Sequence, residues 1–199
     1  MQITVVGGTG LVGQGILKTL SQTPGYELYS LSRHGKRTNS VSGVTYHDGS
    51  FADKVWQDLI KSSDWVIDCV GILHEDPKRG QTYQNSIVEP AERIAAIMQD
   101  QNNRLIFVSA NYAPIFFSSY LNAKRYTEKS LVNYLGDRVI ILYPGLIYDR
   151  ERLSTYYLGK VLEKIPMLSK LRPIKRTDFA EEVKKIISHS KQSELQDRK

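Results

Sequence analysis

Tyr120 and Lys124 have the spacing of an acid–base pair. The two residues are four positions apart in Tyr120-Leu121-Asn122-Ala123-Lys124, so on a helix their side chains share one face. A phenol has a pKa of about 10, and an adjacent ammonium group stabilises the phenolate and lowers that pKa. Ser109, eleven residues earlier, supplies a hydroxyl that could polarise a substrate carbonyl opposite the phenol. We therefore predict that Ser109, Tyr120 and Lys124 relay a proton while a bound cofactor passes hydride.

A second pair with the same spacing, Tyr156 and Lys160, lies farther along the chain. It comes after the sixth predicted strand, at 139–143, whereas Tyr120 lies near the start of the helix that follows the fifth predicted strand, at 105–109. Position favours Tyr120 and Lys124 as the functional pair, and we interpret Tyr156 and Lys160 as part of a surface helix.

A glycine-rich loop, Gly7-Gly8-Thr9-Gly10-Leu11-Val12-Gly13, follows the first predicted strand and opens the first predicted helix. Glycines at 7, 10 and 13 allow a sharp turn, close approach to a pyrophosphate and tight packing of helix against strand. The free N–H groups and the positive end of the helix dipole then hold the anion. The candidate cofactor-binding residues of this loop are Gly7, Thr9, Gly10, Leu11, Val12 and Gly13.

The end of the second predicted strand indicates which dinucleotide binds. A carboxylate there would hold the ribose 2′-hydroxyl of NAD(H) and repel a 2′-phosphate, but the strand runs into Ser32-Arg33-His34-Gly35-Lys36-Arg37. Arg33 can form two hydrogen bonds with a phosphate, and Lys36 or Arg37 adds positive charge. The sequence therefore favours NADP(H) over NAD(H), the alternative being a solvated basic loop.

Strands and helices alternate along the chain, which predicts a parallel sheet covered on both faces. We predict strands at 2–6, 27–31, 44–46, 65–70, 105–109 and 139–143, and helices at 11–21, 52–61, 84–101 and 118–135. The strands are mostly apolar, as doubly buried strands should be. The predicted fold class is α/β, a Rossmann-type doubly wound sheet with a small carboxyl-terminal appendage on the substrate side. Its domain covers 1–188, and a polar tail over 189–199 is expected to fray.

Composition sets further bounds. The chain has 199 residues, 41% of them hydrophobic, and a net charge of +6 without a long basic run, which argues against nucleic-acid binding. It shows no signal peptide, no transmembrane segment and one cysteine, so we expect a cytoplasmic protein. Cys69 is interpreted as packing rather than as a nucleophile, and His74 and His189 lack the spacing of metal ligands.

With these features in this order, residues 1–188 resemble the short-chain dehydrogenase/reductase superfamily. The likeness is to its extended and atypical branches, which include epimerase/dehydratase-like, NmrA-like and complex I accessory-subunit-like proteins. The residues that carry it, besides the glycine loop, Arg33, Ser109 and the Tyr–Lys pair, are Asp48, Asp68-Cys69-Val70-Gly71, Asn85, Glu128, 143–148 and 172–180.

The resemblance implies roles for several of these positions. Asp48 and Gly49 would contact adenine, and Cys69, Val70 and Gly71 would line the adenosine ribose and the pyrophosphate. Pro144 would contact the nicotinamide and Lys124 its ribose. Asn85 would support a proton relay through water, the alternative being a buried polar helix residue with a hydrogen-bonded partner.

Two departures from the family limit what the resemblance implies about substrate. The chain is about a third shorter than typical extended members, and Tyr143 stands where many relatives have an arginine. Residues 150–172, rich in apolar and basic side chains, should cover a cleft for a small apolar carbonyl or quinone-like molecule, or form a homodimer face. We expect an NADP(H)-dependent oxidoreductase; the alternative is a non-catalytic NADP(H)-binding regulatory or assembly module.

Overall fold

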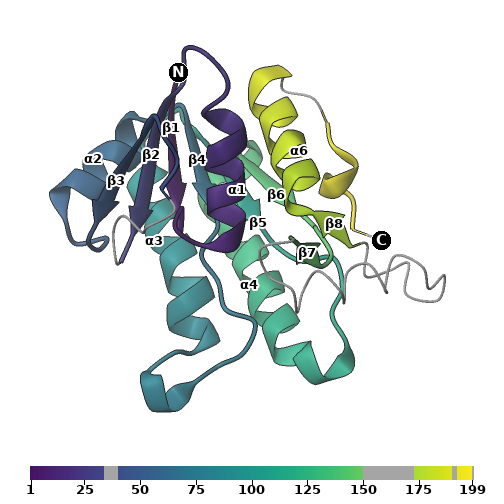
Figure 1. Ribbon diagram of the computed structural model, residues 1–199. Coiled ribbons are helices and arrows are strands. Elements are labelled where there is room, and N and C mark those ends of the chain that lie inside the picture. Colours follow the sequence, from purple (N-terminus) through teal and green to yellow (C-terminus); the bar gives the residue numbers. More distant parts are fainter. Residues whose placement is uncertain (34–39, 150–172, 190–191, 199) are drawn as a thin grey trace.

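Six strands form one parallel sheet in the order β3-β2-β1-β4-β5-β6 (Figure 1). They are β1 (Gln2–Val6), β2 (Glu27–Ser32), β3 (Val44–Asp48), β4 (Trp65–Asp68), β5 (Arg104–Val108) and β6 (Val139–Leu142). This computed structural model describes residues 1–33, 40–149, 173–189 and 192–198. All six predicted strands are confirmed, with ends that differ by at most two residues.

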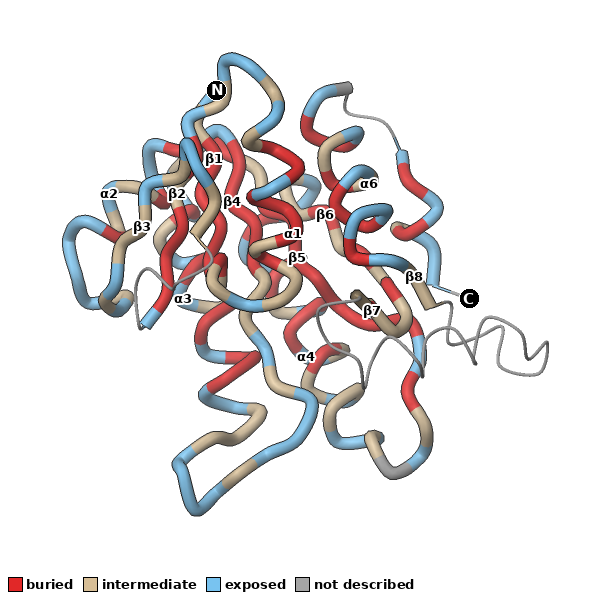
Figure 2. Tube along the Cα trace, viewed as in Figure 1, coloured by how far each residue is buried: buried red, intermediate tan, exposed pale blue. Residues whose placement is uncertain are grey.

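Helices pack on both faces of the sheet (Figure 1). One face carries α1 (Leu11–Leu20) and α6 (Arg176–His189), and the other carries α2 (Lys54–Ser62), α3 (Glu89–Met98) and α4 (Ser118–Leu135). Each face has its own apolar core, and Figure 2 shows the buried strands between partly exposed helices. The predicted Rossmann-type, doubly wound α/β fold is therefore confirmed.

Two helical segments differ from the prediction. The expected helix over 84–101 begins as a π-helical turn, Gln84–Val88, and continues as α3. Pro90 explains the change, because it has no N–H to donate to the carbonyl four residues earlier. Helix α6 was not predicted; its first residue, Arg176, is buried against Gly15 of α1 and pairs with Asp149.

The carboxyl-terminal tail is more ordered than expected over its described part. Ser193 caps a short turn, Glu194–Gln196, and Leu195 is buried. The Leu195 carbonyl accepts a hydrogen bond from the Tyr143 N–H at 2.6 Å, directly after β6. One apolar side chain and one cap thus hold this segment against the edge of the sheet. Residues 150–172, expected to cover the substrate, lie outside the described residues.

The strand register brings the functional loops to one edge. Val6 is level with Asp68, and Asp68 with Phe107, so the loops after β1, β4 and β5 leave the sheet together. The strand order reverses between β1 and β4, and in such sheets ligands bind in the crevice at that point. A short parallel pair, β7 (Ile147–Tyr148) and β8 (Ile174–Lys175), adjoins this edge. Within the described residues, no helix is long and apolar enough to cross a membrane.

Candidate active site

Two cavities open at the carboxyl edge of the sheet and share one wall. The first, of about 400 Å³, lies over β1, β2 and α3, and the second, of about 770 Å³, lies between β4, β5 and α4. Cys69, Val70 and Gly71, which follow β4, line both. A single elongated ligand can therefore occupy both cavities by crossing the end of β4.

The glycine loop forms the floor of the first cavity. Gly7 has a φ of 81°, and a Cβ on it would lie 3.0 Å from the Cys69 carbonyl carbon. A Cβ on Gly13 would lie 2.5 Å from the Gly7 oxygen, so the first turn of α1 rests directly on the loop. Gly10 is the N-cap of α1 and has no side chain with which to cap the first N–H groups. This cradle has the shape and the free N–H groups that a pyrophosphate needs, and its binding role stays a prediction.

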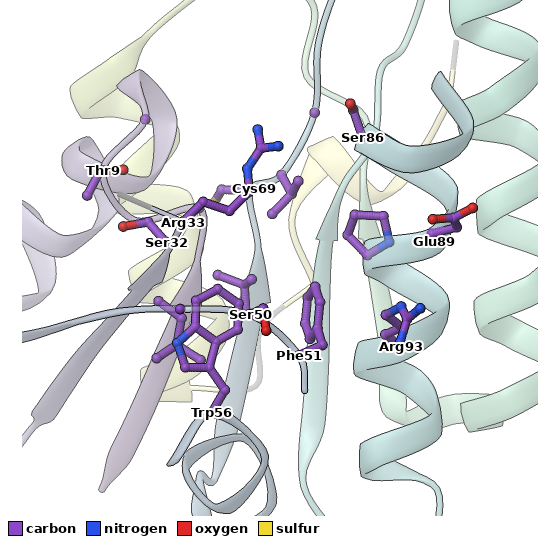
Figure 3. Close-up of a pocket in the computed structure, with 18 of the residues that line it drawn as sticks. Thr9, Ser32, Arg33, Ser50, Phe51, Trp56, Cys69, Ser86, Glu89 and Arg93 are labelled. Atoms are coloured by element: carbon purple, nitrogen blue, oxygen red, sulfur yellow. The ribbon is translucent and has the colours of Figure 1, made fainter. Parts of the chain in front are cut away.

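The rest of the first cavity could hold an adenosine. Thr9 and Gly10 line it beside Arg33, which projects from the end of β2 (Figure 3). Phe51 and Trp56 form an apolar wall, with their rings edge to face at a centroid distance of 5.3 Å. Such a wall suits a flat base.

Two details of this end differ from the expectation, and two of the predicted residues are not described. Gly49 lines the cavity, but the exposed Asp48 beside it does not, so only one of the two predicted adenine contacts reaches the wall. Lys36 and Arg37 lie outside the described residues. Arg93 of α3, which the sequence reasoning missed, lines the cavity on the side opposite Arg33 (Figure 3). Only the packing of α3 against the sheet brings it there.

Lys124 and Tyr120 line the second cavity, together with Ser109, Val12 and Pro144. Lys124 is 3% exposed; its Nζ donates to the Val108 carbonyl at 2.7 Å and lies 4.6 Å from the centroid of the Phe107 ring. Burial lowers the pKa of Lys124 to about 8, against the opposing charge of Asp68. The ammonium form therefore still predominates at pH 7.

Tyr120 differs from the expectation in its acidity. Burial raises the pKa of the phenol to about 12, an effect that the Arg125 guanidinium opposes and the Tyr83 phenol reinforces. The expected lowering of this pKa by Lys124 is not found. At pH 7 the phenol of the free protein thus holds its proton and is placed to donate it rather than to accept one.

Asn85 lies away from the Tyr–Lys pair. It is exposed, its Nδ2 donates to the Gly80 carbonyl at 2.6 Å, and its Oδ1 accepts from the Thr82 N–H at 3.0 Å. It lines the first cavity and not the second. The structure therefore does not bring Asn85 to Tyr120, and it is not the buried polar residue of the alternative interpretation either.

Within the described part of the chain, the structure gives no binding or catalytic contact to the predicted residues Leu11 and Cys69 beyond the lining already described. Leu11 begins α1 behind the loop and lines neither cavity. Burial raises the pKa of the Cys69 thiol, which keeps it protonated and agrees with packing rather than nucleophilic attack. Among the described residues, no three histidine, cysteine, aspartate or glutamate side chains gather to hold a metal ion.

Asp68, at the end of β4, is a buried carboxylate that the sequence reasoning did not use for chemistry. It is 1% exposed; Oδ1 accepts from the Val70 N–H at 2.9 Å, and Oδ2 has no hydrogen-bond partner among the described residues. Burial raises the pKa of Asp68 to about 6, although that hydrogen bond and the Lys124 charge oppose the shift. Its charge in turn helps to keep Lys124 protonated.

We expect Asp68→Asn to change how stability depends on pH. Because the folded-state pKa lies above the unfolded one, Asp68 favours the folded state below about pH 4, and this advantage is lost as pH rises through about 6. The asparagine side chain does not titrate. The free energy of unfolding of Asp68→Asn, compared with that of wild type, should therefore rise between pH 4 and 7 by up to ~3 kcal/mol. Urea unfolding at several pH values measures this difference, and Asp58→Asn, at an exposed position, is the control. If the unfolding free energies of wild type and Asp68→Asn changed with pH in parallel, the prediction would be refuted.

The fold and the site together define a Rossmann-type α/β protein with a glycine-rich loop at the point where the strand order reverses. A family model, the NAD dependent epimerase/dehydratase family, matches residues 3–134. The chain belongs to this family, which confirms the resemblance to extended and atypical short-chain dehydrogenases/reductases.

Individual relatives are distant. An uncharacterized chloroplastic protein of Arabidopsis thaliana is 22% identical over 179 residues, which cover 82% of this chain and 58% of that protein. The chain thus spans well under two thirds of that relative. Because it is chloroplastic, the expected cytoplasmic location stays a prediction.

Solved structures show the same fold. The oxidoreductase ylbE from Lactococcus lactis has a TM-score of 0.69 at 17% identity, covering 94% of this chain and 84% of that one. The UDP-glucuronic acid 4-epimerase from Bacillus cereus, in complex with NAD, has a TM-score of 0.72 at 14% identity, covering 96% and 75%. A mutated uronate dehydrogenase has a TM-score of 0.69 at 16% identity, covering 96% and 70%.

Proposed function

We propose that this protein is an NADP(H)-dependent oxidoreductase that reduces a small apolar carbonyl or quinone-like compound. The observation that carries the proposal is the pair of joined cavities, with a glycine cradle on one side of the β4 end and Lys124 and Tyr120 on the other. The NAD-bound relative of the same fold and the family membership support a nicotinamide dinucleotide.

The residues present fit such a cofactor. Gly7, Gly10 and Gly13 would hold its pyrophosphate, Arg33 a 2′-phosphate, and Lys124 the ribose next to the nicotinamide. When bound, a reduced nicotinamide supplies hydride. Tyr120 would then donate its phenol proton to the substrate oxygen.

The walls of the second cavity favour an apolar substrate. Apart from the Tyr–Lys pair and Ser109, most of its lining is aliphatic or aromatic, including Ile72, Leu73, Phe117, Leu146 and Ile147. An apolar wall excludes water, which strengthens the interactions of the few polar groups with the substrate oxygen. The homodimer that the sequence analysis allows stays a prediction.

Arg33 should decide which dinucleotide binds. We expect Arg33→Ala to weaken NADPH binding by about tenfold or more and to leave NADH binding within about twofold, because the guanidinium loses charge-assisted hydrogen bonds only to the 2′-phosphate. Calorimetric titration of both cofactors measures this. The control is Arg79→Ala, an arginine 81% exposed outside both cavities. Equal weakening of both cofactors would refute the NADP(H) assignment.

One observation favours a second candidate, a non-catalytic NADP(H)-binding module that controls a partner. The Ser109 hydroxyl donates to Glu128 rather than into the cavity. Under this alternative the oxidised and reduced cofactors must bind with different affinities, because only differential affinity shifts a conformational equilibrium. Equal affinities would exclude it.

A further inference from the structure

A cluster of buried and partly buried polar side chains joins β5, α4 and the end of β6 behind the second cavity. Its centre is the carboxylate of Glu128, a residue that is 7% exposed. Oε1 accepts hydrogen bonds from the Ser109 hydroxyl and from Arg125 Nη1, and Oε2 accepts from the Tyr143 hydroxyl at 3.3 Å. Three donors from three separate segments of the chain thus compensate one buried negative charge.

Arg125 ties the same cluster to the loop that follows β5. Its Nη2 donates to the carbonyls of Ala110 and Asn111 at 2.8 and 3.0 Å, and Nη1 also donates to the Ser109 oxygen at 3.4 Å. The guanidinium carbon lies 5.4 Å from the centroid of the Tyr143 ring. One rigid fork therefore fixes both the loop backbone and the carboxylate that holds Ser109.

This arrangement decides which way the Ser109 hydroxyl can act. A hydroxyl has one proton to donate, and in Ser109 that proton is donated to Glu128. A hydrogen bond to a carboxylate is roughly twice as strong as one to a neutral carbonyl, so a substrate ketone does not compete for the proton. One lone pair of the Ser109 oxygen accepts from Arg125 Nη1. Ser109 is 4% exposed, and what remains for the second cavity, which it lines, is the second lone pair of its oxygen.

We propose that Glu128 and Arg125 are positioning residues that make Ser109 a hydrogen-bond acceptor toward the substrate. The inference rests on the proposed function and deepens it. The oxygen of the carbonyl form takes its proton from Tyr120, and the hydroxyl of the alcohol product donates to Ser109. Tyr120 thus recognises the carbonyl form of the substrate, and Ser109 recognises the alcohol form. Ser109 is therefore an acceptor and not the hydrogen-bond donor expected from the sequence.

A double-mutant cycle tests the contact without substrate or turnover. We expect Ser109→Ala to lower the thermal unfolding midpoint by about 5 °C in wild type and by less than half of that in Glu128→Gln, because the lost partner is then no longer a charge. The matched control is Ser130→Ala with Glu92→Gln, another serine–carboxylate bond on α4, at 2.8 Å, but only partly buried. Additive losses for Ser109 and Glu128 would overturn the proposal.

Turnover provides the second readout, with NADPH and 1,4-naphthoquinone as the probe. We expect Tyr120→Phe to lose about 100-fold or more in kcat, since only the phenol acts as an acid. Ser109→Ala should lose at least tenfold less in kcat than Tyr120→Phe and should weaken inhibition by the hydroquinone product, which loses its acceptor. A loss in Ser109→Ala as large as in Tyr120→Phe would show that Ser109 donates, and would overturn the proposal. If wild type itself is inactive, the proposed function fails, and the unfolding cycle alone decides whether Glu128 holds the Ser109 proton.

Discussion

Replacing Tyr120 by phenylalanine should lower turnover by about 10²–10⁴-fold and leave cofactor affinity within about twofold. The phenol lines the second cavity and holds its proton at pH 7, because burial raises its pKa to about 12. Phenylalanine keeps the ring and its packing but cannot donate.

Steady-state oxidation of NADPH with a panel of quinones and apolar aldehydes measures the loss. Tyr126→Phe is the matched control, because Tyr126 is on the same helix but 59% exposed and outside both cavities. Turnover of Tyr120→Phe at the wild-type rate would contradict the acid role. Normal cofactor binding combined with no turnover in either protein would favour the regulatory module instead.

Gly13→Ala should disrupt the cofactor cradle. The added Cβ would lie 2.5 Å from the Gly7 oxygen and 2.6 Å from the Gly8 Cα, and both are backbone atoms that cannot move aside without shifting the loop. Overpacking of this kind costs about 1–3 kcal/mol of stability. Because the same loop would hold the pyrophosphate, we expect NADPH affinity to fall by about tenfold or more.

Urea unfolding and calorimetric titration separate the two effects of this substitution. The neighbouring Gln14→Ala, also in the first turns of α1, adds no atom to the loop and should leave both quantities near wild type. Wild-type affinity in Gly13→Ala would mean that the loop does not hold the cofactor.

Much of the fold could be predicted because its signals are local. The apolar strands and the glycine loop are contiguous in sequence, and the strand register then brings their ends together. Helix α6 was missed even though Phe179, Val183 and Ile186 follow helical spacing and are buried. That signal was available in the sequence, but Phe179 was included only through the family resemblance, and Val183 and Ile186 were not assigned.

The site was predictable in its composition but not in its electrostatics. Lys124 and Tyr120 reach the same cavity as expected from their spacing. The raised pKa of Tyr120 depends on burial, which no local pattern reports. The Glu128–Ser109 bond joins residues 19 positions apart in two elements, and only tertiary packing shows that Arg125 and Tyr143 complete it.

The most direct measurement of the central claim is calorimetric titration of the unmodified protein with NADPH, NADP⁺, NADH and NAD⁺. The joined cavities, the glycine cradle and Arg33 predict that all four bind at one site per chain, and that the phosphorylated pair binds about tenfold or more tightly than the other pair. Binding of none of the four would contradict both the oxidoreductase and the regulatory module, and would leave only the fold.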